Sequence, residues 1–392
     1  MKFAKIKPIF KKEDKNNPEN YRPISLLPVF SKIFERIVYN RLISFFNKYD
    51  ILNKRQFGFR KHMSTSCAIY EFTEYLLKML DSKKHVRGIF ADLSKAFDLV
   101  KHSILLKKLE YYGVRGTPLA LLSSYLNNRS QAVFLPGKNG NPISSKSQPI
   151  EHGVPQGSIL GPLLFLVYIN DLPGFLSPFD TVLYADDTNV LISSEDLISV
   201  NELSKNCTSK LNDWFSANKL MLNLDKTKSI DFSCTNQPVS DDTVDAHDED
   251  NISVKFLGLV IDHNLNWKEH VRYLCPKLSS ACYALKQLSP ITDTETLITV
   301  YNSYFQSYLS YGIIFWGNST DCSKVFKIQK RALRIINHSS NYCSCRPLFA
   351  KFRILPLFSL YNMSYYDFVK EMLTNSLKIA FFIHTTHGIV QH

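Results

Sequence analysis

The chain has 392 residues and a net charge of +12, and 45% of its residues are hydrophobic and 13% aromatic. This length is enough for two or three domains, and the composition excludes a disordered polybasic tail. No apolar stretch reaches the roughly 18 residues that a membrane span needs, and the first residues lack the apolar core of a signal peptide. The eight cysteines have no regular spacing, which indicates reduced thiols in an intracellular protein.

Hydrophobic spacing and capping residues predict a chain that mixes helices and strands. The first expected element is a helix in residues 24–48 that begins after Ser31 and has Ile33, Ile37, Leu42 and Phe46 as apolar positions. A helix at 64–81, a strand at 85–91 that ends at Asp92, helices at 102–112 and 117–127, and strands near 130–135 and 146–150 are expected to follow. The later elements are a helix at 159–172 capped by Ser158, a hairpin of 181–185 and 189–193, a helix at 196–220, and strands at 228–233 and 253–261. From residue 268 onward the pattern is mainly helical.

The positive charge is distributed unevenly along these elements. Residues 1–61 carry a net charge of +10 and residues 251–392 carry +8, whereas residues 62–240 are neutral and residues 241–250 carry −6. Two basic regions around a neutral middle are typical of a groove that binds a polyanion such as nucleic acid. Solvated basic faces explain the charge equally well. The acidic stretch 238–251 is expected to be a flexible connector, because it lacks the glycine and the terminal glutamate of an EF-hand calcium loop.

Three aspartates lie at the ends of predicted strands. Asp92 ends one strand, and Asp186 and Asp187 occupy the tip of the hairpin. Adjacent acids between apolar strands are costly unless a cation neutralises them. Mg²⁺ prefers oxygen ligands, and a pair of such ions can hold the attacking and leaving oxygens of a phosphoryl displacement. An ordinary turn is the alternative, because Asp is common in hairpins.

The neighbouring segments favour the metal site. An aromatic residue, Phe97, follows Asp92 by five positions, and the segment 153–162 combines glycines with a helix N-terminus that could face a phosphate. The segments 90–98, 153–162 and 184–187 resemble, in this order, motifs A, B and C of reverse transcriptases. The likeness is greatest to the enzymes of non-LTR (LINE-type, jockey and CR1-like) retrotransposons.

Further segments extend this resemblance over residues 7–340. Residues 7–12, 20–27 and 56–60, the last with Ser64 and Thr65, resemble the motifs of the fingers region. Residues 214–228 resemble motif D, and residues 256–258, with Asp262 and Trp267, resemble motif E. Ala-Asp-Asp at 185–187, instead of Gly-Asp-Asp, and the triplet Pro155-Gln156-Gly157 disfavour a viral RNA replicase.

The resemblance implies a role for each matching residue, although taken alone the aromatic and apolar residues favour core packing and the polar and basic ones favour a solvated surface. Asp92 and Asp186 would bind two Mg²⁺ ions, which Mn²⁺ can replace, with Asp187 as a weaker ligand and the carbonyl of Leu93 as a further oxygen. Phe97 would stack under the deoxyribose, and Gln156 and Gly157 would line the nucleotide pocket. The general acid would be Lys226, with Lys228 as the alternative. The triphosphate would be reached by Arg60 and less surely by Arg22. The primer end would be held by Phe256, Leu257 and Gly258.

A basic helix face is predicted near the C-terminus. Lys324, Lys327, Arg331 and Arg334 recur at helical spacing, opposite Val325, Ile328, Ala332 and Ile335. The basic face could track a phosphate backbone or could simply be solvated. Cys343 and Cys345 invite a zinc site, but four ligands are not evident.

The sequence therefore predicts an α+β right-hand polymerase with fingers at 1–84, a palm at 85–262, a helical thumb at 263–345 and a C-terminal extension at 346–392. The expected activity is RNA-directed DNA synthesis in the nucleus, with an RNA template, a DNA primer, dNTPs and no membrane. A silent remnant that only binds nucleic acid, and an adaptor that reuses the palm, are the alternatives. The chain matches no endonuclease, so it is expected to be a fragment of a longer element protein.

Overall fold

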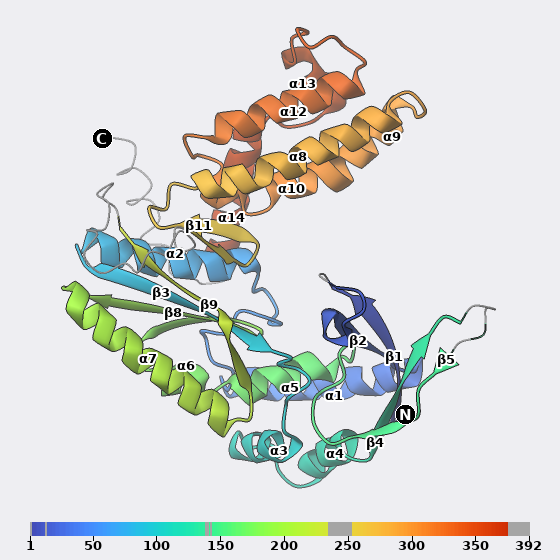
Figure 1. Ribbon diagram of the computed structural model, residues 1–392, viewed down its shortest axis with the longest axis vertical. Helices are drawn as coiled ribbons and strands as arrows, with labels where there is room; N and C mark the ends of the chain where they lie inside the picture. Colours follow the sequence, from blue (N-terminus) through green and yellow to red (C-terminus); the bar gives the residue numbers. More distant parts are fainter. Residues whose placement is uncertain (1, 12–13, 138–140, 142, 234–252, 375–392) are drawn as a thin grey trace. The chain divides into compact units, whose positions relative to one another are not determined.

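The chain folds as two compact units, Met1–Asp231 and Phe232–His392, in a computed structural model that describes residues 2–11, 14–137, 141, 143–233 and 253–374 (Figure 1). The predicted connector 238–251 lies outside the described residues.

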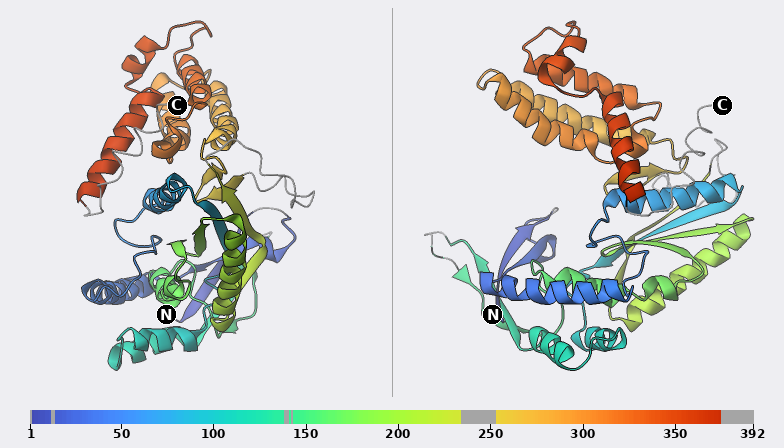
Figure 2. Two further views of the ribbon diagram at one scale, coloured as in Figure 1. Left: turned by 90° about the vertical axis from the view of Figure 1, so that its left-hand side faces the viewer. Right: turned by 180° about the vertical axis from the view of Figure 1, so that it is seen from behind.

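A four-stranded antiparallel sheet forms the centre of the first unit. Its strand order is β7 (Asp180–Tyr184), β8 (Asp187–Ser194), β3 (His85–Ser94) and β9 (Met221–Phe232). Helices α2 (Thr65–Asp81) and α7 (Leu197–Ala217) cover its two faces (Figure 1, Figure 2). Because both faces are covered, β3 is buried almost continuously from Gly88 to Ala91 instead of alternating between buried and exposed positions.

The core of the first unit surrounds α5 (Leu160–Ile169), which is buried all round. This helix was predicted, but its N-cap position is Ile159 and not Ser158. Ser158 still supports the first turn, because its Oγ accepts a hydrogen bond from the Gly161 N–H at 2.9 Å. Helices α1 (Val29–Lys48), α3 (His102–Tyr111), α4 (Thr117–Leu126) and α6 (Leu172–Phe175) contribute to the same unit.

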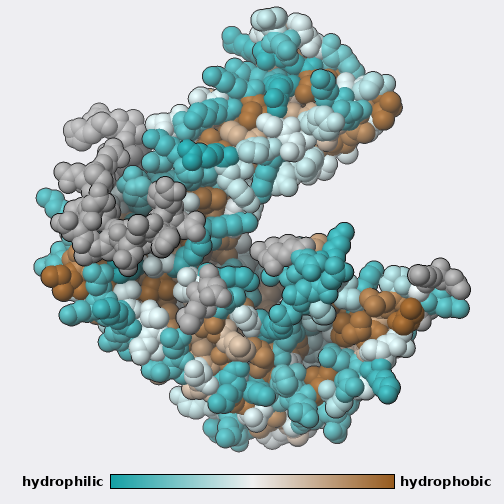
Figure 3. Space-filling view, viewed as in Figure 1, coloured by the Kyte–Doolittle hydropathy of each residue, from teal (hydrophilic) through white to brown (hydrophobic). Residues whose placement is uncertain are grey.

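A second sheet was only partly predicted. Its order is β2 (Tyr21–Leu26), β1 (Phe3–Phe10), β4 (Arg129–Leu135) and β5 (Ile143–Ser144), and β6 (Gln148–Ile150) also pairs with β4. An apolar patch lies over β1, β4 and β5 in the space-filling view, where Leu135 and Ile143 are exposed (Figure 3). A short 3₁₀ helix, η1 (Pro18–Asn20), precedes β2.

The predicted start of the first long helix is wrong. Strand β2 continues to Leu26, and α1 begins at Val29 after Pro28, so Ser31 is a buried residue within the helix and not its N-cap. The apolar positions also divide: Leu42 and Phe46 are buried, whereas Ile33 and Ile37 are 54% and 58% exposed.

The second unit is mainly helical, as predicted. It begins with a hairpin of β10 (Ser253–Phe256) and β11 (Leu259–Asp262), which the sequence had placed in the palm. Its helices are α8 (Lys268–Leu288), α9 (Thr294–Val300), the π-helical turn η3 (Tyr301–Phe305), α10 (Gln306–Ser310), α11 (Ile313–Trp316), α12 (Cys322–Ile336), α13 (Arg346–Phe352) and α14 (Leu357–Thr374). Across the described ranges of both units, no helix combines the length and the apolar character that crossing a membrane requires.

Candidate active site

The three predicted aspartates meet at one end of the central sheet. Ala185 and Asp186 form the two-residue turn between β7 and β8, and Tyr184 pairs with Asp187 at its base. Strand β3 runs beside β8, and its ladder ends at the pair of Ala91 with Thr188. One further step along both strands brings Asp92 opposite Asp187. Strand register therefore gathers carboxylates that are far apart in the sequence.

Negative charge accumulates at this turn. Burial, with the Asp92 carboxylate as a further cause, raises the pKa of Asp186, while Arg22 and Lys11 act in the opposite direction. Burial and the carboxylates of Asp186 and Asp92 raise the pKa of Asp187 to about 6. The Asp187 side chain is exposed, so water will screen part of this effect. Among the described residues, the ion pair of this cluster is a long one: Lys226 Nζ lies 3.9 Å from Asp92 Oδ2, and both side chains are about half exposed.

This charge fits a divalent cation. Within the described part of the chain, no three His, Cys, Asp or Glu side chains are arranged to hold an ion by themselves. Mg²⁺ needs only one or two carboxylates, because it completes its shell with water and substrate phosphates. The aspartates of this cluster are therefore suited to a metal that arrives with a nucleotide.

Phe97 lies in an aromatic stack beside the aspartates. Its ring stacks on Phe165 with a centroid distance of 4.6 Å, and the Phe59 ring meets it edge-on at 6.0 Å. Phe97 as a whole residue is only partly buried. The Leu93 side chain, in contrast, packs in the core and is 6% exposed.

The loop that contains Gln156 and Gly157 is attached to two other segments. Gln156 Nε2 donates to both carboxylate oxygens of Asp98, at 2.9 and 3.0 Å, and the Gln156 carbonyl accepts from the Ser25 N–H at 2.7 Å. Burial raises the pKa of Asp98, and the Gln156 hydrogen bond opposes this rise. Gly157 has φ +109°, and a Cβ there would lie 2.9 Å from the Ser25 carbonyl oxygen. The loop backbone thus approaches β2 as closely as only glycine permits.

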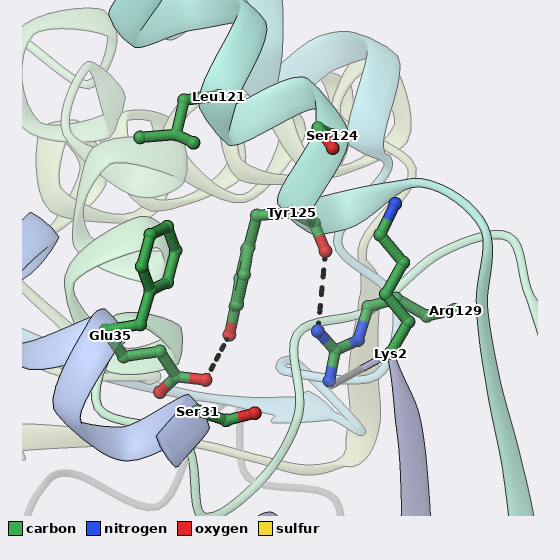
Figure 4. Close-up of a pocket in the computed structure, with 8 residues that line it drawn as sticks. Lys2, Ser31, Glu35, Leu121, Ser124, Tyr125 and Arg129 are labelled. Atoms are coloured by element: carbon green, nitrogen blue, oxygen red, sulfur yellow. Dashed lines mark hydrogen bonds between the residues drawn. The ribbon is translucent and has the colours of Figure 1, made fainter.

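A buried glutamate that was not predicted as a site residue hydrogen-bonds the backbone just after the same loop. Glu35 is 1% exposed, and its carboxylate accepts from the Ile159 N–H at 2.6 Å and from the Tyr125 hydroxyl at 2.9 Å (Figure 4). Burial raises the pKa of Tyr125, so the phenol remains a donor. Arg129 Nη1 donates to the Tyr125 carbonyl at 3.4 Å, beside a hollow of about 140 Å³. The spacing of Glu35 with Leu42 and Phe46 was a usable signal, since it places an acid on a buried helix face.

The two predicted arginines differ in their surroundings. Arg60 is partly buried, and its Nη1 donates to the carbonyls of Asn53 at 2.8 Å and Gln56 at 3.3 Å. Burial lowers the pKa of Arg60. Arg22 is exposed, and its charge acts on Asp186. Arg60 therefore braces its own loop, and Arg22 is the freer cation near the aspartates.

The predicted primer-holding residues form the turn of the β10–β11 hairpin in the second unit. Phe256 is buried, Leu257 has φ +45° and Gly258 has φ +89°. Tyr311 Oη donates to the Leu257 carbonyl at 2.5 Å, and a Cβ at Gly258 would lie 3.0 Å from the Tyr311 ring. Tyr311 therefore contacts this turn, and the positive φ of Gly258 favours glycine there.

The predicted basic face is present on α12. Lys324, Lys327 and Arg331 are exposed, whereas Arg334 is partly buried and its Nε donates to the Cys343 carbonyl at 2.9 Å. The opposite face is buried through Val325 and Ala332, with Ile328 and Ile335 partly buried.

Comparison with known proteins agrees with this geometry. Residues 10–274 match the family described as "Reverse transcriptase (RNA-dependent DNA polymerase)". The chain is 31% identical over 350 residues to "Probable RNA-directed DNA polymerase from transposon BS" of Drosophila melanogaster, across 83% of this chain and 37% of that protein. It is 27% identical to "RNA-directed DNA polymerase from mobile element jockey" of the same species, across 84% and 37%. The chain thus spans well under half the length of these relatives.

A solved structure shares the fold. The "Structure of apo telomerase from Candida Tropicalis" has a TM-score of 0.51 at 12% identity, over 93% of this chain and 62% of that chain. The predicted α+β right-hand polymerase fold is confirmed, and so is the resemblance to the jockey type of enzyme. The chain belongs to the reverse transcriptase (RNA-dependent DNA polymerase) family.

Proposed function

We propose that the chain is the polymerase region of an RNA-directed DNA polymerase of a non-LTR retrotransposon. In this reaction a primer 3′-hydroxyl attacks the α-phosphate of a dNTP opposite an RNA template, and pyrophosphate leaves. The observation that carries the proposal is the meeting of Asp92, Asp186 and Asp187 at the turn between β7 and β8. The names fingers, palm and thumb, with their predicted limits, belong to the same proposal, as does a nuclear location.

Two Mg²⁺ ions, or Mn²⁺ in their place, would be held by Asp92 and Asp186, with Asp187 and the Leu93 carbonyl as further oxygen ligands. When bound, such ions neutralise the attacking and leaving oxygens of the displacement. The raised pKa values of Asp186 and Asp187 support this assignment, because burial and then the neighbouring carboxylates make the charged forms costly, and a bound cation would offset both effects.

The chain's own side chains would position the nucleotide. Exposed Arg22 and Lys11 would bind the triphosphate, and Arg60 supports this role less well because its Nη1 already has two acceptors. Phe97 would contact the deoxyribose. Lys226, 3.9 Å from Asp92, would hold the proton for the leaving pyrophosphate, since it reaches the carboxylate cluster.

The second unit would hold the nucleic acid. The turn at Phe256, Leu257 and Gly258 would support the primer end. The four cations of α12 would contact the backbone phosphates of template and primer, mainly through the three that are exposed.

Primer extension tests the proposal. The full chain is incubated with an RNA template, an annealed DNA primer, dNTPs and Mg²⁺, and template binding is measured in parallel. Extension by the wild-type chain supports a polymerase. Template binding without extension would favour the silent remnant, and neither binding nor extension by a folded chain would favour an adaptor.

A further inference from the structure

The catalytic turn contains a residue in an unfavourable backbone conformation. Ala185 has φ +56°, in the left-handed region that residues with a Cβ rarely adopt. Such a conformation persists only when the surrounding structure fixes it. Because Ala185 directly precedes Asp186, whatever fixes Ala185 also determines the direction of the Asp186 carboxylate.

One buried side chain hydrogen-bonds both backbone polar groups of Ala185. Gln56 is 2% exposed, and its Oε1 accepts from the Ala185 N–H at 3.0 Å while its Nε2 donates to the Ala185 carbonyl at 3.3 Å. The same Oε1 also accepts from the Gly58 N–H at 2.7 Å. A single amide therefore connects the turn to its own loop, in a place that water does not reach.

The backbone around Gln56 extends this attachment along β7. The Phe57 N–H donates to the Leu183 carbonyl at 2.8 Å, and the Leu183 N–H donates to the Arg55 carbonyl at 2.9 Å. A Cβ at Gly58 would lie 2.2 Å from the Ala185 nitrogen, so only glycine allows the two segments to approach so closely. Residues 55–58 thus lie against the catalytic hairpin like a short additional strand.

The loop also reaches the nucleotide side of the site. Its next residue, Phe59, meets the Phe97 ring edge-on, and Arg60 donates to the Gln56 carbonyl. The segment that fixes the turn is therefore continuous with the aromatic stack next to the aspartates.

We propose that Gln56 is a positioning residue that holds the Ala185 backbone and thereby aims the Asp186 carboxylate. Gln56 does not touch the reacting atoms. This inference rests on the proposed polymerase function for its kinetic test. Glutamine meets the requirement because its side chain offers an acceptor and a donor at the same reach, whereas asparagine is one methylene shorter and methionine has the same length but neither amide group.

The decisive variant is Gln56→Met, and Gln329→Met is the matched control. Gln329 is 0% exposed and, like Gln56, uses both ends of its amide, donating to Tyr301 Oη at 3.0 Å and accepting from the Leu357 N–H at 2.9 Å. Both substitutions remove buried hydrogen bonds at nearly constant volume. They differ in that only Gln56 contacts the catalytic turn.

Two readouts separate positioning from general destabilisation. In single-turnover extension with the full chain, Gln56→Met is expected to lower the rate by about 10- to 100-fold and to raise the Mg²⁺ concentration for half-maximal rate. Primer–template affinity should stay unchanged. In hydrogen exchange, the peptide around residues 183–187 should exchange faster in Gln56→Met, whereas Gln329→Met should leave both that peptide and the Mg²⁺ dependence as in the wild type.

Gln56→Asn keeps both amide groups on a side chain that is one methylene shorter, and should fall between wild type and Gln56→Met in both readouts; it also takes over the test if Gln56→Met does not fold. Wild-type Mg²⁺ dependence and wild-type exchange of the 183–187 peptide in a folded Gln56 variant would overturn the inference. If the wild-type chain extends no primer, the polymerase proposal fails, and hydrogen exchange alone still decides whether Gln56 holds the turn.

Discussion

Replacing Gly157 with alanine tests whether the backbone of the Gln156–Gly157 loop packs so closely against β2 that a side chain at position 157 is not tolerated. The alanine methyl would lie 2.9 Å from the Ser25 carbonyl oxygen, at a backbone φ of +109°. A left-handed conformation costs a residue with a Cβ about 1–2 kcal/mol, and loss of the hydrogen bond between Ser25 N–H and the Gln156 carbonyl adds about 0.5–1.5 kcal/mol. We therefore expect Gly157→Ala to lower the free energy of unfolding by about 2–3 kcal/mol.

Thermal unfolding and nucleotide kinetics measure this effect. For a unit of this size, 2–3 kcal/mol corresponds to a fall of roughly 5–10 °C in Tm. The KM for dNTP should rise as well, because the displaced loop carries Gln156. Gly174→Ala is the matched control: Gly174 lies in α6, its φ is not positive, and among the described residues no atom lies within 4 Å of the place that an alanine methyl would take. This control should be neutral or slightly stabilising. Equal Tm and KM for Gly157→Ala and wild type would refute the reasoning.

Two further predictions concern the second unit. Burial lowers the pKa of His270 to about 4 from 6.5, and its Nδ1 accepts from the Val260 N–H at 3.2 Å. The unfolded chain therefore takes up the proton first, so about 3 kcal/mol of stability present above pH 6.5 is lost as the pH falls toward 4; urea unfolding at pH 7.5 and 5 should show about 2 kcal/mol of this loss, and His270→Gln should reduce it. On α12, we expect that changing Lys324, Lys327 and Arg331 together to glutamine weakens the salt dependence of duplex binding. The slope of log binding constant against log salt concentration should become shallower by up to about 0.9 for each cation removed. An unchanged slope would contradict their contact with phosphates.

Local signals in the sequence were sufficient for most elements. The start of α2 follows from Ser64, whose Oγ accepts from the Cys67 N–H at 3.3 Å. The β7–β8 hairpin follows from two apolar runs around residues 186–188, although the turn itself is Ala185-Asp186, and Asp187 and Thr188 belong to β8. The pairing of β1 with β4 was missed because the two strands are parallel and more than a hundred residues apart, and no local pattern encodes such a partner. The antiparallel pairing of β1 with β2 is local, and it was missed because residues 24–28 were assigned to the following helix. The exposed side chains of Ile33 and Ile37 follow the helical spacing of a buried face, so the spacing alone could not reveal their exposure.

The residues of the candidate site likewise fall into those that local sequence signals predicted and those that they did not. Motif residues such as Asp92 and Asp186 were identified because their neighbours in the sequence carry the resemblance. Glu35 was not identified, and Gln56 was recognised only as part of a fingers motif and without a role, because each acts on a backbone more than 120 residues away. A buried polar residue is recognisable in the sequence by its place on an apolar face, but its partner becomes known only when the chain is folded.

The central claim is that the aspartates at the β7–β8 turn carry out nucleotide transfer, and single-turnover primer extension on an RNA template tests it most directly. Asp186→Asn keeps the size of the side chain and removes its charge, and Asp213→Asn makes the same change at an exposed position on α7. We expect Asp186→Asn to lower the extension rate by at least about 100-fold and Asp213→Asn to extend like the wild type. Equal extension by the Asp186→Asn and wild-type chains would contradict the account.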